Sequence, residues 1–167
     1  MTTAILAGAF GLLGVIVGGL MNGVVSAGLD RVREARLAMI TARLVQSDLL
    51  YVDAIVTAEI DEGEWKRLAQ GAPPVPFDSW QEGREALAGG LREYQDWAVV
   101  EIAARQALRV VVVAPTNPNP PGTALSPEEI ANLATLLPEM REGVKTLQPA
   151  AHGALVPTLR RAIFSHR

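Results

Sequence analysis

The sequence predicts an all-α protein in which an N-terminal transmembrane helix, residues 1–29, continues into a small cytoplasmic helical bundle, residues 30–167. Three observations predict this class. No charged side chain occurs from Met1 to Leu29, and no Pro or Gly interrupts the chain from Asp30 to Glu62. Apolar residues then recur at intervals of three and four in the later segments, as on amphipathic helices.

The uncharged stretch from Ala4 to Leu29 is long enough to span a bilayer. As a helix it measures about 40 Å, against roughly 30 Å for the hydrocarbon core. Two alternatives stay open. A secretory signal has a candidate cleavage site at Val25-Ser26-Ala27 but lacks a preceding basic residue, and a buried core helix needs a larger globule around it.

Small residues follow one another at three- or four-residue spacing along this segment, which includes the GxxxG pairs Gly14/Gly18 and Gly19/Gly23. Because lipid provides no hydrophobic drive between helices, close approach across small residues is the main source of association. We therefore expect a homo-oligomer. The expected packing face comprises Gly11, Gly14, Gly18, Asn22 and Ser26. The alternative is that Gly and Ala are simply frequent in this chain.

The flanking charges predict the orientation. Arg31, Arg33 and Arg36 directly follow the apolar segment, which indicates an N-terminus outside the cell membrane and a cytoplasmic C-terminal domain. These arginines are expected to contact anionic lipid head groups. The absence of cysteine is compatible with a reducing compartment. A net charge of −3 with dispersed basic residues gives no sign of a nucleic-acid partner.

A long amphipathic helix is expected from Asp30 to about Glu62, continuous with the span. Its apolar stripe either packs on later helices of the same chain, which we favour, or extends the expected packing face between copies as a short coiled coil. The stripe consists of Val32, Leu37, Ile40, Leu44, Tyr51 and Ile55.

Loops are expected near residues 63–78 and 115–126, where Pro and Gly or Pro and Asn accumulate. Between them, Ser79 and Glu82 match a capping box, with Phe77 as a hydrophobic staple. Gly89-Gly90 predicts a break in the following helix. The run of valines after Arg109 has the composition of a strand but no partner strand, so we interpret it as a buried helix end.

The last long helix has the strongest start signal: Ser126 as N-cap, Pro127 at the first position and Glu129 completing a capping box. Pro138 is expected to bend it, and Pro149 with Gly153 to end it. A short helix from Leu155 to Phe164 is expected to follow. Together these segments predict a four-helix bundle or three long helices with a tail.

The sequence carries no catalytic motif. Its two histidines, His152 and His166, stand far apart, and phosphate-binding and nucleophile motifs are absent, so we expect no enzyme activity, no cofactor and no metal site. Asp48 and Asp53 interrupt an apolar stretch and are the candidates for buried carboxylates, with Arg84, Arg92 or Arg105 as partners; we favour salt bridging or exposure over a catalytic role. An acidic cluster at a helix end suggests either a weak cation site or a solvated loop edge, which we favour; it contains Glu59, Asp61, Glu62 and Glu64.

Three tryptophans remain. Trp97 is expected in the core. Trp65 and Trp80 flank the Pro-rich loop, and we favour a position in the core or as a clamp on this loop over contact with lipid head groups.

The Gly-rich span, the Arg-rich exit and the series Trp80, Arg84, Leu87-Ala88, Leu91 and Trp97 resemble uncharacterised small single-pass membrane-anchored proteins of high-GC Gram-positive bacteria. The resemblance covers about residues 10–105 and implies no activity. Two functional classes follow from the residues. One is a membrane-anchored interaction or scaffold protein with an unidentified protein partner; the other is a homo-oligomeric pore with a cytoplasmic helical cap.

Overall fold

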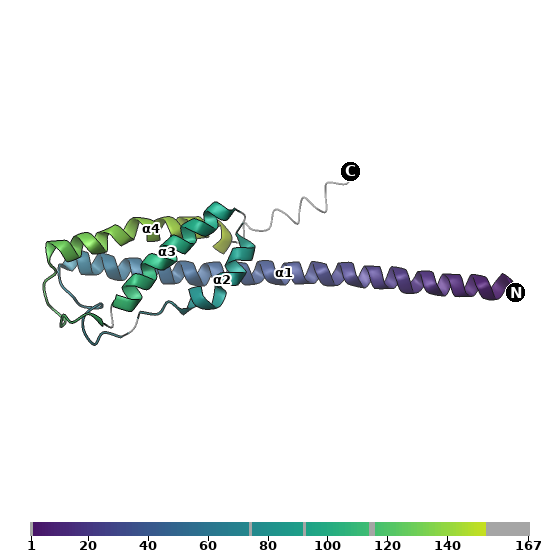
Figure 1. The fold of residues 1–167 in the computed structure, drawn as a ribbon, viewed down its shortest axis with the longest axis horizontal. Helices are drawn as coiled ribbons and strands as arrows, with labels where there is room; N and C mark the ends of the chain where they lie inside the picture. The colour runs from purple at the N-terminus through teal and green to yellow at the C-terminus, as the bar shows by residue number, and fades with distance from the viewer. Residues whose placement is uncertain (1, 74, 92, 114–115, 153–167) are drawn as a thin grey trace. The chain divides into compact units, whose positions relative to one another are not determined.

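A computed structural model describes residues 2–73, 75–91, 93–113 and 116–152, with surroundings given for all of these except 2–17, 20 and 113. Over these residues the chain is all-α, with four helices and no strand: α1 (Thr2–Glu62), α2 (Asp78–Gly90), α3 (Tyr94–Val113) and α4 (Pro127–Ala151) (Figure 1). The all-α class and the helical bundle are confirmed. The chain divides into two compact units, residues 1–36 and 37–167.

Of the four helices, the first unit contains only the N-terminal part of α1, up to Arg36. The expected continuity of this helix through Leu29 is confirmed, because α1 runs for 61 residues without interruption. Its apolar side chains Met21, Val24 and Val25 are exposed. Within the described residues, no helix has a stretch that is both long and apolar enough to cross a membrane. Most of the expected span, from Ala4 onward, lies outside the residues whose surroundings are described.

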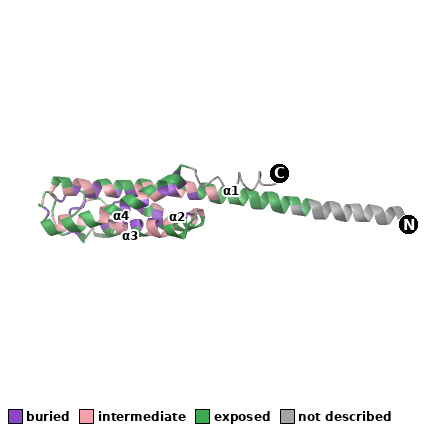
Figure 2. Cartoon of the chain, turned by 90° about the horizontal axis from the view of Figure 1, so that it is seen from above, coloured by how far each residue is buried: buried purple, intermediate pink, exposed green. Residues whose placement is uncertain are grey.

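In the second unit, α1 buries a regular row of residues spaced alternately by four and three positions (Figure 2). This spacing keeps one side of a helix against its neighbours for several turns. The residues of this row, which we call the inner row, are Ala38, Ala42, Val45, Leu49, Val52, Val56 and Glu59, and each is at most 3% exposed.

The inner row is not the stripe that the sequence suggested. Leu37, Ile40, Leu44 and Tyr51 are 56%, 42%, 52% and 44% exposed, so the prediction that they pack on later helices is wrong; only Ile55 of that stripe in this unit is buried. At about 100° per residue, the two sets lie roughly 120° apart around the helix axis. We call the four exposed residues the outer face of α1.

The physical reason is close helix packing on the inner side. A Cβ atom at Gly83 of α2 overlaps the side chain of Thr41, and one at Gly143 of α4 overlaps Ala103 and comes within 3.6 Å of Leu49 Cδ1. Helices approach this closely only where small residues face one another. Alanine and glycine therefore mark the helix contacts, although they carry little hydrophobic signal.

The two loops lie where predicted, and they pair with each other. The N–H of Trp65 donates to the Thr123 carbonyl at 2.8 Å, that of Gly122 to the Trp65 carbonyl at 2.7 Å, and that of Leu125 to the Gly63 carbonyl at 2.8 Å. Gly63 and Gly122 have φ of 68° and 83°, where a side chain is strained. The C-terminal end of α1 is thereby tied to the start of α4.

The capping box of α4 is confirmed: the Glu129 N–H donates to Ser126 Oγ at 3.2 Å, and the Ser126 N–H to Glu129 Oε2 at 2.7 Å. Pro138 lies inside the helix as expected. Pro149 also lies inside, and α4 ends two residues later at Ala151, between Pro149 and Gly153 as predicted; the His152 N–H donates to the Gln148 carbonyl at 3.1 Å. The predicted helix at 155–164 lies outside the described residues.

The capping box expected for α2 is wrong. The helix begins at Asp78, and Phe77 precedes it without a side-chain cap. Ser79 Oγ instead donates a hydrogen bond to the Asp48 carboxylate on α1. The break at Gly89-Gly90 is confirmed, because α2 ends at Gly90.

The valine run is helical as predicted and forms the end of α3. Its burial is uneven: Val110 is 3% exposed, whereas Val112 is 64% exposed.

Candidate functional site

The described residues of the expected packing face contact no other described part of the chain. Gly18, Asn22 and Ser26 are exposed, and a Cβ atom added at Gly18 meets nothing within 4 Å. Gly19, Gly23 and Gly28 are equally open. Gly11 and Gly14 lie outside the residues whose surroundings are described. The described part of this face is thus accessible to another helix.

The arginines that follow are exposed. Arg33 Nη1 lies 3.8 Å from Asp30 Oδ1, but both side chains are mostly solvated, at 78% and 65% exposure. Pairs of this kind contribute little. Arg31 and Arg36 form no ion pair within the described part of the chain. All three guanidinium groups are therefore accessible to anions.

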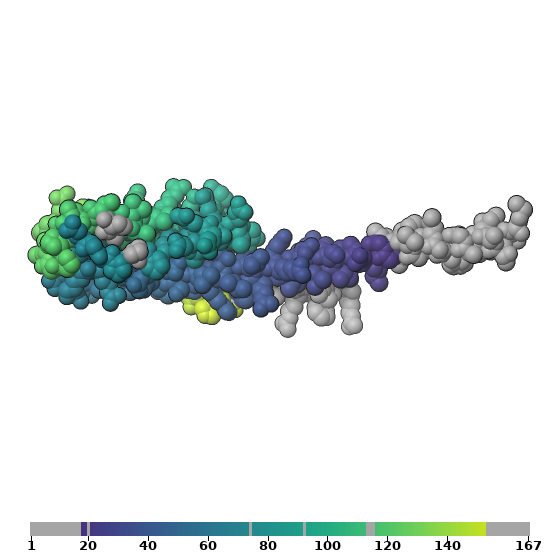
Figure 3. Space-filling view, turned by 90° about the horizontal axis from the view of Figure 1, so that it is seen from below, coloured from purple at the N-terminus to yellow at the C-terminus, as the bar shows by residue number. Residues whose placement is uncertain are grey.

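The outer face of α1 is an apolar strip with a charged rim. Beyond Tyr51, it continues into a cavity of about 340 Å³ whose lining includes Ala54, Ala58 and Lys66. Figure 3 shows blue side chains of α1 uncovered beside the green and teal helices. An apolar centre bordered by charged groups is the usual composition of a protein-binding surface.

Lys66 at this rim is held in an acidic environment. Its Nζ lies 2.7 Å from Glu62 Oε2 and 3.0 Å from Glu64 Oε1. Hydrogen bonds to these two carboxylates, that to Glu62 contributing most, raise the pKa of Lys66 to about 12. The side chain stays charged at every physiological pH.

Glu59 departs from the expected solvated loop edge. It is 2% exposed, and its carboxylate accepts the N–H groups of Lys66, Arg67 and Leu68 at 2.7, 2.5 and 3.2 Å. These bonds fix the turn that follows α1. Glu62 and Glu64 pair with Lys66, whereas Asp61 is exposed and takes no part in these contacts. No group of three or more potential metal ligands occurs in the described segments.

The salt bridges join other partners than expected. Asp53 Oδ1 lies 2.8 Å from Arg141 Nε, which connects α1 to α4. Arg84 and Arg105 both pair with Glu101 Oε1, at 3.1 and 3.0 Å. The Glu101–Arg105 pair has the i,i+4 spacing of a local pair within α3. Local spacing does not reveal the other two pairs, because each joins two different helices. The two remaining residues are Asp48, which accepts from Ser79, and Arg92, which lies outside the described residues.

The tryptophans are structural. Trp65 and Trp80 are 6% and 5% exposed and belong to the hydrophobic core, which contradicts contact with lipid head groups. Trp97 is half-buried and stacks on Trp80.

The histidines offer no shared site. His152 Nδ1 lies 2.7 Å from the Gln148 carbonyl at the end of α4, and His166 lies outside the described residues.

The described residues therefore present an exposed apolar face on α1 and exposed arginines before it. No protein-family model matches this chain, and no curated protein or solved structure is significantly similar to it.

Proposed function

We propose that this chain is a membrane-anchored helical interaction protein, in which the N-terminal segment self-associates in the bilayer and the 37–167 unit binds a protein partner. The observation that carries the proposal is the outer face of α1. Four large apolar side chains lie in a row on one helix, each at least 42% exposed. Contiguous exposed apolar surfaces of this kind mark interaction sites, and one helix face is a common recognition element.

The membrane anchor is supported by the charge pattern. No charged residue occurs before Asp30, and exposed arginines follow immediately. The described end of this segment also exposes Met21, Val24 and Leu29, with 55–72% of each side chain accessible. Such a surface is costly in water and favourable in lipid.

The first experiment is alkaline carbonate extraction of membranes from cells that produce the full chain. We expect the wild-type chain to stay with the lipid, and the double variant Leu13→Arg/Val17→Arg to be released, since each central Arg costs about 3 kcal/mol of insertion free energy. Release of the wild-type chain contradicts the anchor. The matched control, Leu13→Ile/Val17→Ile, should behave like the wild type.

Self-association is measured by native mass spectrometry of the full chain from mild detergent. A dimer is expected to become a monomer when Gly14 and Gly18 are both replaced by Ile, because the helices can no longer approach closely. An unchanged oligomer in that variant removes the packing face. A ring of five or more copies favours the pore instead of the anchor.

The partner surface is tested by site-specific photocrosslinking in the producing cells. A crosslinker at Ile40 or Leu44 is expected to capture the same protein, and one at Val112, equally apolar and 64% exposed, is expected to capture none. Identical adducts from Val112 contradict a specific surface on α1.

A further inference from the structure

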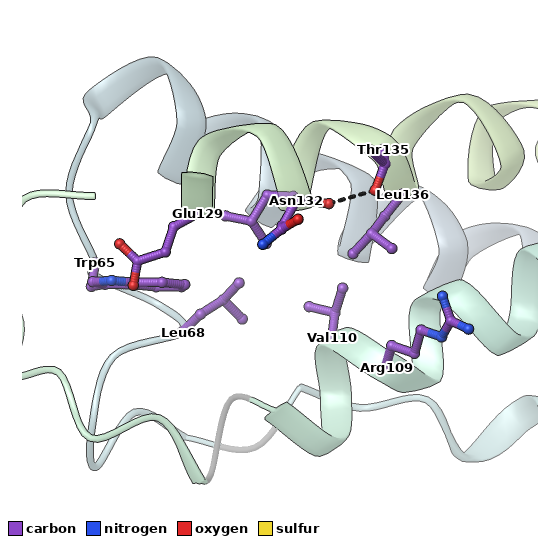
Figure 4. A pocket seen from close by; sticks show the side chains of 9 residues that line it. Trp65, Leu68, Arg109, Val110, Glu129, Asn132, Thr135 and Leu136 are labelled. Carbon is purple, nitrogen blue, oxygen red and sulfur yellow. Dashed lines mark hydrogen bonds between the residues drawn. The ribbon is translucent and has the colours of Figure 1, made fainter. Parts of the chain in front are cut away.

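A cavity of about 330 Å³ lies where α3 and α4 meet the turn that follows α1 (Figure 4). Its inner walls are apolar: Trp65, Leu68 and Val110 are 6%, 3% and 3% exposed. Leu133 and Leu136 of α4 line it as half-buried side chains. The volume is at the lower end of the range of small-molecule sites, about 300–1,000 Å³.

One cation stands at the mouth of the cavity. Arg109 is exposed on α3, and its Nη1 donates to Gln106 Oε1 at 3.0 Å. No carboxylate pairs with it among the described residues, whereas Arg105 on the same helix is paired with Glu101. The guanidinium of Arg109 therefore retains donors for a bound anion.

The carboxylate at the cavity, Glu129, is already engaged. It accepts the N–H of Ser126 at 2.7 Å and Asn119 Nδ2 at 3.4 Å. Hydrogen bonds from the Ser126 backbone and side chain lower the pKa of Glu129, with smaller contributions from the Trp65 indole and Asn119. The Trp65 Nε1 atom has no hydrogen bond of good geometry among the described residues. Glu129 thus serves the start of α4 and stays ionised at neutral pH, so an anionic head group in the cavity has to lie at the Arg109 end, away from Glu129 (Figure 4).

We propose that this cavity binds a small amphipathic carboxylate, with its apolar body on Trp65, Leu68 and Val110 and its carboxylate on Arg109. The planar fork of a guanidinium matches a carboxylate in a bidentate arrangement, which favours this anion over a neutral head group. The volume suits one short alkyl chain or one aryl group. This inference is independent of the proposed membrane anchor and partner surface.

The probe is octanoate, compared with octan-1-ol and octylammonium, each added to the full chain in nanodiscs of neutral lipid. Methyl NMR spectra of Leu- and Val-labelled protein separate binding in the cavity from partition into lipid. We expect octanoate to shift the methyl signals of Leu68, Val110 and Leu136, and to leave those of Leu49 and Val52 in place. Octan-1-ol is expected to bind about tenfold more weakly, as for one exposed charge-assisted hydrogen-bonded pair.

The charge contact is tested by Arg109→Gln, with Arg105→Gln as the matched control on the same helix. Arg105 is 70% exposed and does not line the cavity. We expect Arg109→Gln to reduce the octanoate affinity about tenfold, to that of octan-1-ol, and Arg105→Gln to leave it unchanged.

Four results overturn the proposal. These are the absence of shifts at the cavity methyls of the wild-type chain, equal affinity for octanoate and octan-1-ol, equal effects of the two Arg substitutions, and tighter binding of octylammonium. The last result identifies Glu129 as the head-group partner. The wild-type comparison decides the question even where a variant does not fold.

Discussion

The indole rings of Trp80 and Trp97 stack with their centroids 5.3 Å apart and their planes at 20°. The guanidinium carbon of Arg84 lies 6.0 Å from the first ring centroid and 5.8 Å from the second. This contact joins α2 to α3. Because α2 has only 13 residues, its helical structure depends on such packing more than on its own backbone bonds.

Replacing Trp80 by Ala is expected to lower the free energy of unfolding by about 3 kcal/mol, since it removes a buried aromatic side chain and leaves a cavity. Trp80→Phe should cost less than half as much, because a ring remains on Trp97. Urea unfolding followed by circular dichroism measures both. Tyr94→Ala is the control, because Tyr94 is 83% exposed. Equal effects of Trp80→Ala and Tyr94→Ala contradict a stabilising role for the stack.

Replacing Glu59 by Ala is expected to lower the free energy of unfolding by about 2–4 kcal/mol, because three backbone N–H groups lose their acceptor. Glu59→Gln should be less harmful, since the amide oxygen still accepts. Amide hydrogen exchange of Lys66, Arg67 and Leu68 reports the same loss locally. The control is Asp61→Ala, at an exposed position nearby. Unchanged exchange in Glu59→Ala shows that the carboxylate does not hold this turn.

Gly143→Ala is expected to destabilise the bundle by about 1–3 kcal/mol, because the new methyl group meets Ala103. Adding Ala103→Gly should restore part of the loss, since it frees the same space from the other helix. Thermal unfolding of both single variants and the double variant gives the coupling energy. Gly89→Ala is the control: it has open space and should stabilise slightly. Strict additivity of the two substitutions refutes the close contact.

The Glu129 carboxylate, which caps α4, should make the stability of the protein depend on pH. Its bonds to Ser126 place the folded-state pKa of Glu129 below the ordinary value of 4.5. The stabilisation is therefore complete above about pH 4.5 and is lost as the pH falls through the lowered pKa. The difference in free energy of unfolding between the wild type and Glu129→Gln should shrink as the pH falls from about 4.5 through the lowered pKa. Unfolding at several pH values measures it, with Glu128→Gln as the control; a constant difference contradicts the assignment.

Local signals predicted the helix content well. The long uninterrupted α1, the Gly-Gly end of α2 and the Ser126-Pro127-Glu129 start of α4 depend on neighbouring residues, which the sequence displays directly. Ser79 failed as a cap because a distant carboxylate, Asp48, takes its hydroxyl group.

The buried side of α1 was the main error. The exposed leucines at 37 and 44 carry a stronger hydrophobic signal than the buried alanines at 38 and 42, yet close helix packing favours the small residues. The cavity between α3, α4 and the turn after α1 was likewise missed, because Trp65, Arg109 and Glu129 come from three separate segments. The unpaired state of Arg109 is a signal that only the arrangement of the helices reveals.

The separation of the inner row from the outer face has a consequence for how this chain can change over time. Substitutions at Ala42 or Val45 alter folding, whereas those at Ile40 or Leu44 leave the bundle intact. In the proposed function, recognition and folding therefore depend on different sides of one helix. Exposed positions of the outer face can then change without loss of the bundle, and with them the proposed partner.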